Sequence, residues 1–281
     1  MSRLETDIDA HGTLGEVERR KNISVDEFWA RYAIPGVPVV LEGLAEDWPA
    51  RSLWTFDFFR QNYGGKDVTV WAGGRKTTSR IMKLNSYLEY MESTQDEIPD
   101  YLSRWCLAGF PELRAQYRRP AHFPCWTDCL PSDLRPTWKW LYMGPAGSGS
   151  GMHSDFMGTS AWNVLFAGRK LWRFYPPDQR SRLYAGEVDA FRPDYVKFPL
   201  FSDAEGLACV QRPGDTIFTP PNWWHQVRNE TSTLALTENV ANETNGHRLY
   251  AEDEPERRLL TLFAEHVPAF RRTLTASNRF P

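Results

Sequence analysis

The second half of the chain is a series of short β-like runs separated by turn residues, and this spacing constrains the fold more than any other feature. The runs lie at residues 138–143, 159–166, 169–175, 207–211, 216–219 and 231–239. Pro213-Gly214-Asp215 and Pro220-Pro221-Asn222 are turn sequences, because proline fixes φ and glycine permits a positive φ. Ala167-Gly168 lies between two runs and predicts a hairpin. Regularly spaced short strands predict a mainly β fold, a barrel or a sandwich.

Helices are predicted on both sides of this β region. Ser24 followed by Glu27 is a capping-box pattern, which predicts a short helix carrying Phe28, Trp29 and Tyr32. Thr55 predicts the start of a second helix, which Gly64-Gly65 ends. The remaining predicted elements are strands at 37–41 and 68–72 and helices at about 85–92, 112–117 and 254–274.

The organisation that follows is one barrel domain over residues 21–245. Residues 1–20 show little periodicity and are expected to be flexible. Residues 246–281 form a C-terminal helical segment with an apolar stripe. This stripe packs either on its own domain or on a second subunit, and we favour a homodimer.

Composition and charge narrow the function classes. The chain of 281 residues has 33 basic and 36 acidic side chains, so its net charge of −3 provides no general attraction for nucleic acid. No apolar run approaches the roughly 18–20 residues of a membrane span, and residues 1–22 lack a signal-peptide pattern. The four cysteines are too few for a disulfide scaffold. We expect a cytoplasmic protein with reduced thiols and with no membrane or clear nucleic-acid partner.

The strongest chemical signal is His153-Ser154-Asp155 together with His225. In a strand, residues i and i+2 face the same side, so His153 and Asp155 can offer an imidazole and a carboxylate to one ion. His225 would join them from a later strand. Two histidines and one carboxylate with open positions are the ligand set of non-haem Fe(II) oxygenases. Alternatively, each histidine is an ordinary hydrogen-bonded or packed residue.

An oxygenase of this kind needs a co-substrate such as 2-oxoglutarate, whose distal carboxylate requires a cation. Lys170 is a candidate, since a buried ammonium needs an anionic partner. A solvated surface lysine is the alternative. The inward face of the last strand is predicted to carry Thr233, Ala235, Thr237 and Asn239, which suits a ligand cavity as well as an ordinary solvent-facing strand.

At these residues the chain resembles the JmjC-domain (cupin-like) Fe(II)/2-oxoglutarate oxygenases. It is most similar to the small hydroxylase branch of the phosphatidylserine-receptor type, an arginine demethylase and lysyl-hydroxylase. The matching stretches are Met143-Gly144-Pro145, Gly151-Met152-His153-Ser154-Asp155, Gly158-Thr159-Ser160-Ala161-Trp162-Asn163, Gly168-Arg169-Lys170, residues 213–225, residues 88–94 and residues 24–41. The fold that the resemblance implies is a double-stranded β-helix, the jelly-roll or cupin barrel, with flanking N- and C-terminal helices.

The resemblance also implies roles for particular residues. His153, Asp155 and His225 would be the iron ligands and the catalytic centre. Lys170 would bind the distal carboxylate of 2-oxoglutarate, with Tyr101 and Thr237 donating to it. Asn163 and Asn239 would lie beside the iron-bound end of the co-substrate, and Ser150 would lie near the co-substrate.

The implied reaction consumes O2 and 2-oxoglutarate, releases succinate and CO2, and hydroxylates a substrate C–H bond. The substrate is predicted to be a protein side chain or peptide, with a lysyl-type hydroxylase favoured. A small metabolite or sugar, or N-methyl demethylation, stays open. A cupin-like protein that binds metal or ligand without turnover is the alternative from another class.

Three further motifs are weaker. His122, Cys125 and Cys129 have the spacing of zinc ligands, but no fourth ligand is evident and ordinary cysteines are favoured. The basic residues Arg114, Arg118, Arg119 and Arg135 are either a solvated face or a rim for an acidic substrate. The segment 194–197 is predicted to border the mouth of the site, where it would contact substrate.

Overall fold

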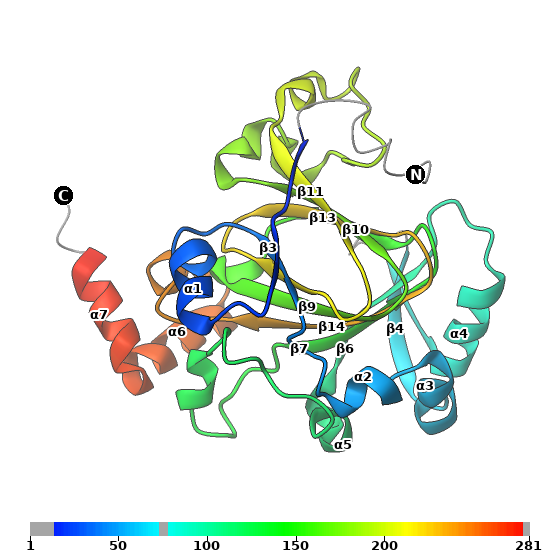
Figure 1. Ribbon diagram of the computed structural model, residues 1–281, viewed down its shortest axis with the longest axis horizontal. Coiled ribbons are helices and arrows are strands. Elements are labelled where there is room, and N and C mark those ends of the chain that lie inside the picture. Colours follow the sequence, from blue (N-terminus) through cyan, green and yellow to red (C-terminus); the bar gives the residue numbers. More distant parts are fainter. Residues whose placement is uncertain (1–13, 73–77, 278–281) are drawn as a thin grey trace.

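Two β-sheets face each other around a cup in the computed structural model, which describes residues 14–72 and 78–277 (Figure 1). The minor sheet is, in spatial order, β1 (Leu14–Glu16), β11 (Gly206–Gln211), β10 (Lys170–Tyr175), β13 (Trp224–Asn229) and β8 (Gly149–His153). The major sheet is, in spatial order, β2 (Arg19–Lys21), β3 (Val39–Glu42), β12 (Thr216–Thr219), β9 (Ser160–Ala167), β14 (Thr233–Val240), β7 (Lys139–Gly144), β6 (Tyr101–Cys106), β4 (Asp67–Trp71) and β5 (Ser79–Lys83). The predicted mainly β barrel with flanking helices is confirmed.

Helices lie outside the two sheets and at both ends of the chain. The α-helices are α1 (Val25–Phe28), α2 (Pro49–Leu53), α3 (Phe56–Tyr63), α4 (Leu84–Ser93), α5 (Pro111–Arg114), α6 (Glu254–His266) and α7 (Pro268–Ser277). A π-helical turn, η1 (Trp29–Ala33), continues α1. Short 3-10 turns are η3 (Leu107–Gly109), η4 (Trp126–Cys129), η5 (Phe156–Gly158), η6 (Pro177–Ser181), η7 (Tyr184–Gly186), η8 (Pro199–Asp203) and η9 (Gly246–Arg248).

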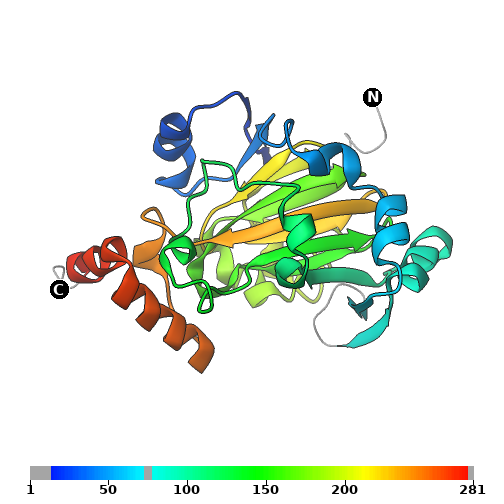
Figure 2. The same cartoon turned by 90° about the horizontal axis from the view of Figure 1, so that it is seen from below.

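The main hydrophobic core lies on the outer face of the major sheet. Leu102 of β6, Leu141 of β7 and Leu236 of β14 are fully buried there, together with Trp54 and Phe59 from the α2–α3 region. Seen from below, the helices and the segment 107–135 cross this face of the sheet (Figure 2). The outer face of the major sheet is therefore covered by packed side chains.

A smaller core covers the outer face of the minor sheet. The long connection between β10 and β11 folds back on that sheet, so that its Leu183, Phe198 and Phe201 pack with Tyr175 and Trp224. Figure 1 shows this connection above β11 and β13. The segment 176–205 is thus held beside the opening of the cup.

Local signals in the sequence identified most N-terminal elements. The backbone N–H of Glu27 donates to Ser24 Oγ at 3.2 Å at the start of α1, and Phe58 N–H donates to Thr55 Oγ1 at 3.0 Å at the start of α3. Both predicted caps are confirmed. The predicted hairpin at Ala167-Gly168 is wrong, because β9 and β10 belong to different sheets. Gly168, with φ +84°, instead turns the chain from one sheet to the other.

The two termini differ from the sequence prediction. Residues 1–13 lie outside the described residues, but residues 14–20, predicted to be flexible, form β1 and the start of β2 around the buried Val17. The predicted helix 254–274 is broken into α6 and α7 at Val267-Pro268, since proline cannot continue the hydrogen bonding of a helix interior. The apolar stripe packs on its own domain: Phe263 and Phe270 contact Trp126. The homodimer stays a prediction.

Among the described residues, the structure contains no helix with the length and apolar character that a bilayer crossing requires.

Candidate functional site

A cavity of about 770 Å³ opens between the two sheets. Its lining includes every residue proposed for the site from the sequence: His153, Asp155, His225, Lys170, Tyr101, Thr237, Asn163, Asn239 and Ser150. The closed end of the cup is filled by an apolar cluster that includes Trp172, Phe174 and Ile217. The cavity therefore has an apolar floor, polar walls and a mouth where exposed residues such as Glu97 and Asp194 line it.

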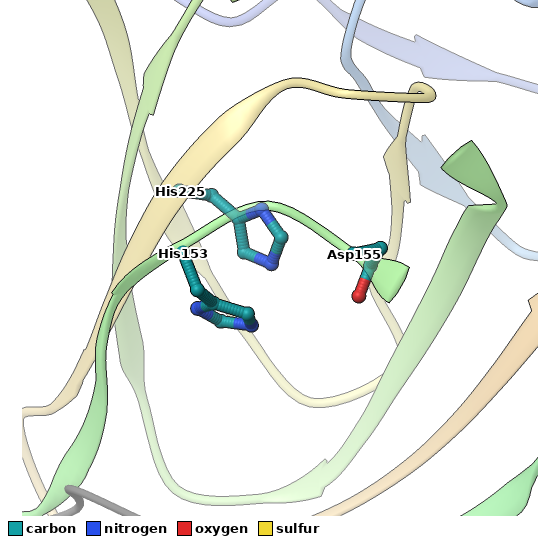
Figure 3. Close-up of side chains that lie close together, drawn as sticks. All are labelled: His153, Asp155 and His225. Atoms are coloured by element: carbon teal, nitrogen blue, oxygen red, sulfur yellow. The ribbon is translucent and has the colours of Figure 1, made fainter. Parts of the chain in front are cut away.

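His153, Asp155 and His225 form a compact group of possible metal ligands. One ligand atom from each lies within 4.8 Å of the others. The two imidazole rings are 4.2 Å apart between centroids, and Figure 3 shows them side by side with Asp155 beyond them. Within the described residues this is the one group of three or more His, Cys, Asp or Glu side chains that could hold a metal ion.

The backbone brings these three side chains together in a way that differs partly from the prediction. β8 ends at His153, so Asp155 is not on the strand but in the turn that enters η5. His225 pairs with His153 across β13 and β8. Gly149 allows this close pairing, because a Cβ there would lie 2.0 Å from Val227 O, whereas at Gly151 a Cβ would meet open space.

Two features of this group fit a bound cation. Asp155 Oδ2 is buried and has no hydrogen-bond partner within the part of the chain that the structure describes, which is costly for a carboxylate unless an ion supplies the missing contact. His225 Nδ1 lies 3.1 Å from Trp223 O and His153 Nδ1 lies 2.8 Å from Gly151 O. These backbone contacts at Nδ1 orient each Nε2 for a ligand, as outer contacts do in metal sites.

Lys170 is buried in the cup, with 1% of its surface exposed. Its Nζ donates to Tyr101 Oη at 3.0 Å and to Asn229 Oδ1 at 2.8 Å, both neutral acceptors. Burial lowers the pKa of Lys170 from 10.5 to about 7, and it raises the pKa of Tyr101 well above its ordinary value. The described residues form no salt bridge with Lys170. The site thus holds a buried amine whose charged form an anionic ligand would favour.

The predicted polar contacts on the opposite wall lie on β9 and β14. Asn163 Nδ2 donates to Thr237 Oγ1 at 2.6 Å, and Asn239 Nδ2 donates to Thr159 Oγ1 at 2.9 Å. Ser150 lines the cavity from β8. The structure therefore gathers all nine residues in one cavity, while their individual roles stay predictions.

The sequence reasoning missed two residues that support this wall and the lysine. Gln211 Nε2 donates to Asn163 Oδ1 at 2.9 Å, and Trp172 Nε1 donates to Gln211 Oε1 at 2.9 Å, so the Asn163 amide is held in one orientation. Asn229 accepts from Lys170. Asn229 could have been predicted from the sequence, because it follows His225 by four residues and the two-residue period of a strand places both side chains on one face.

The weaker motifs do not join the site. His122 Nε2 lies 2.9 Å from Ile23 O, and Cys125 is buried beside Thr127, so the zinc pattern is not assembled. Arg119 donates to Glu238 at 2.8 Å on the outer face of β14, and Arg118 pairs with Asp47. None of Arg114, Arg118, Arg119 and Arg135 lines the cavity, so they do not form a substrate rim. Asp194 and Lys197 do line it, as predicted for the segment 194–197.

Comparison with known proteins agrees with this architecture. The family model described as "Cupin-like domain" matches residues 25–243, and the chain belongs to this family. The predicted resemblance to JmjC-domain (cupin-like) proteins is confirmed.

Three curated relatives each align with 82% of this chain. Lysine-specific demethylase JMJ21 of Arabidopsis thaliana is 37% identical over 247 residues, which are 26% of that protein. Bifunctional arginine demethylase and lysyl-hydroxylase psr-1 of Caenorhabditis briggsae is 32% identical over 255 residues, 62% of its length. Arginine-specific demethylase JMJ22 of Arabidopsis thaliana is 32% identical over 241 residues, 47% of its length. The chain thus spans less than two thirds of each relative.

Proposed function

We propose that this protein is an Fe(II)- and 2-oxoglutarate-dependent dioxygenase that hydroxylates a C–H bond of a protein side chain or peptide. The observation that carries the proposal is the pairing of two sites in one cavity: a His-Asp-His group and a buried amine without an anionic partner. A protein that only binds a metal ion would not need the buried amine.

The metal would be held by His153, Asp155 and His225. Two neutral imidazoles and one carboxylate with open positions suit Fe(II) among the common metals. When bound, the iron would supply coordination sites for O2 and for the carboxylate and keto oxygens of 2-oxoglutarate. The unpartnered oxygen of Asp155 supports a cation at this position.

The distal carboxylate of 2-oxoglutarate would bind Lys170. An arriving carboxylate favours the ammonium form and gains a charge-assisted hydrogen bond in a site without water contact. Tyr101 already lies 3.0 Å from Nζ and supplies a second donor to the same carboxylate. Thr237 would also donate to this carboxylate, and Asn163, Asn239 and Ser150 would orient the rest of the co-substrate through neutral hydrogen bonds.

The substrate enters from the mouth, where several carboxylates lie. Glu97, Glu187, Asp189 and Asp194 line this end of the cavity. Together with the relative named as a lysyl-hydroxylase, they favour a lysyl-type substrate. Hydroxylation at an N-methyl carbon would instead release the methyl group, and a small metabolite or sugar would use the same machinery.

The first experiment measures turnover without a known substrate. Anaerobically purified protein is mixed with Fe(II), 2-oxoglutarate and O2, and succinate is quantified over time. We expect slow succinate formation that disappears in His153→Ala. Equal succinate yields from wild type and His153→Ala would contradict the oxygenase proposal. Metal binding without any succinate would favour the non-catalytic cupin-like protein.

The second experiment searches for the substrate. Extracts of host proteins and metabolites are incubated with wild type or His153→Ala and compared by mass spectrometry. A peptide or metabolite heavier by one oxygen only in the wild-type reaction identifies the oxidised molecule, and loss of a methyl group would identify demethylation.

A further inference from the structure

One strand of the major sheet departs from regular alternation at the mouth of the cavity. β6 pairs with β7 through Leu102 opposite Met143 and Trp105 opposite Leu141, with a register shift between them. Ser103 and Arg104 therefore oppose the single residue Tyr142. This arrangement is a β-bulge, which redirects a side chain on the bulged strand.

The bulge changes which side chains face the cup. Leu102 and Trp105 are three residues apart, yet both belong to the core on the outer face of the sheet. In a regular strand Arg104 would share the outer face with Leu102. Instead, both Ser103 and Arg104 line the cavity. The extra residue thus places a guanidinium inside the mouth.

The backbone at Arg104 adopts a conformation that is unfavourable for L-amino acids that carry a side chain. Its φ is +63°, in the left-handed region that glycine and asparagine occupy most readily. Strained residues of this kind gather at binding and catalytic sites, where the surrounding structure keeps them in place. The residue at this position is arginine, not glycine or asparagine. The backbone strain is therefore retained along with the guanidinium group.

The Arg104 side chain is positioned by neutral groups. Its guanidinium lies 5.9 Å from the centre of the Trp140 ring. Burial raises the pKa of Tyr142 to about 12, and the charge and hydrogen bond of Arg104 act against that rise. The Trp140 ring lies 6.3 Å from the ring of Phe156, which follows Asp155 in the sequence, so Arg104 lies on the Asp155 side of the cavity.

Arg104 forms no salt bridge within residues 14–72 and 78–277. Arg192, at the same mouth, pairs with Glu97. Arg104 therefore adds a cation to the cavity besides the buried Lys170, and it is exposed at the mouth, where Lys197 and Arg228 also line the cavity.

We propose that Arg104 determines specificity by binding a carboxylate of the substrate, so that the preferred substrate carries an acidic group next to the carbon that is oxidised. The planar guanidinium can bind both oxygens of a carboxylate in a fixed geometry. This inference rests on the proposed oxygenase function. The carboxylate belongs either to an acidic residue beside the target residue of a peptide or to a free carboxylic acid.

The test uses three probes. Two synthetic peptide pools carry a central lysine and differ only in that aspartate and glutamate of the first pool are asparagine and glutamine in the second. The third probe is a mixture of free amino acids that includes aspartate and glutamate. Each is incubated with wild type, Arg104→Gln, Arg104→Lys, or Arg118→Gln as a control on the outer face. Stimulated succinate formation, oxygen incorporation and retention of probe in ultrafiltration are measured.

We expect wild type to prefer the acidic pool over the amide pool by about tenfold, the size of one charge-assisted hydrogen bond. Arg104→Gln should remove this preference while leaving the KM for 2-oxoglutarate within about twofold. Arg104→Lys should retain part of it, and Arg118→Gln should match wild type. Preference for the free acids over both pools would identify a small acidic substrate and would also support the proposal.

Equal use and equal retention of the acidic and amide pools by wild type would overturn the inference, even if succinate forms normally. Absence of succinate from wild type under all conditions would instead contradict the proposed function. Retention of acidic probes does not require turnover, so it tests Arg104 in that case as well.

Discussion

The two sheets line the same cavity but contribute different chemistry. The minor sheet carries the ionisable groups, with His153 on β8, His225 on β13 and Lys170 on β10. The major sheet contributes mainly neutral amides and hydroxyls, such as Asn163 on β9 and Thr237 on β14. The exception is Arg104, which the β6 bulge turns into the mouth.

This division separates two tasks. Groups that carry charge determine which ions bind, because electrostatic interactions are strong in a site with little water. Neutral groups orient a bound molecule without changing its protonation. Substitutions on the minor sheet should therefore change binding by large factors, and those on the major sheet by small ones. The following predictions test this comparison.

The largest effect concerns Lys170 on the minor sheet. Lys170→Ala should raise the KM for 2-oxoglutarate by tenfold to a hundredfold, because about 1.5–3 kcal/mol of charge-assisted contact is lost. The concentration of Fe(II) that gives half activity should change much less. Succinate formation over a 2-oxoglutarate series measures both. An unchanged KM would show that another cation binds the co-substrate.

The second effect is a pH dependence of 2-oxoglutarate binding. The pKa of Lys170 is lowered by burial from 10.5 to about 7, so above pH 7 binding must take up a proton. Affinity should fall by up to about tenfold for each pH unit above 7. Anaerobic calorimetry from pH 6 to 9 measures this slope. Lys170→Arg stays charged, so a folded variant should show a flat profile.

In the protein without 2-oxoglutarate, Lys170 has the opposite effect on the pH dependence of stability. Because its pKa is lowered on folding, the unfolded chain binds more protons between about pH 7 and 10.5. The contribution of Lys170 to the free energy of unfolding therefore rises with pH across this window, while 2-oxoglutarate affinity falls.

A smaller effect is expected on the major sheet. Thr237→Val keeps the shape of the side chain but removes the hydroxyl that accepts from Asn163 Nδ2 at 2.6 Å. The loss of one neutral hydrogen bond, about 0.5–1.5 kcal/mol, should raise the KM for 2-oxoglutarate by about twofold to twelvefold. An increase in this KM as large as that of Lys170→Ala, measured in the same assay, would contradict the proposed difference between the two sheets.

The smallest effect concerns the strained position on β6. Arg104→Gly should raise the free energy of unfolding by about 0.5–1 kcal/mol, because relief of the left-handed backbone exceeds the lost contact with Trp140. Thermal unfolding measures the shift, with Arg118→Gly as the matched control, which should not gain stability. A lower midpoint for Arg104→Gly would show that the backbone there is not strained.

Patterns that depend on neighbours in sequence were predictable. The caps Ser24 and Thr55 and the β runs after residue 138 rest on short-range rules, and each has its counterpart in the structure. The turn at Gly168 was recognised, but its two strands were paired wrongly, because a turn sequence does not specify which sheet receives the next strand.

Features that depend on distant segments were not predictable. Asp155 lies beyond the end of β8, yet it joins the two histidines because η5 turns the chain back to the cavity. Gln211 looked like an ordinary polar strand residue until the packing of the two sheets placed it beside Asn163.

By itself, the sequence determined the residue types that can bind a metal ion and an anion, and it determined the strand faces that carry many of them, since side-chain direction follows the period of the backbone. Only the tertiary structure decided that these faces turn toward one cavity, that Lys170 meets no charged partner among the described residues, and that Arg104 faces inward. The physical reason is that register, bulges and burial arise from contacts between segments far apart in the chain, which no local pattern contains.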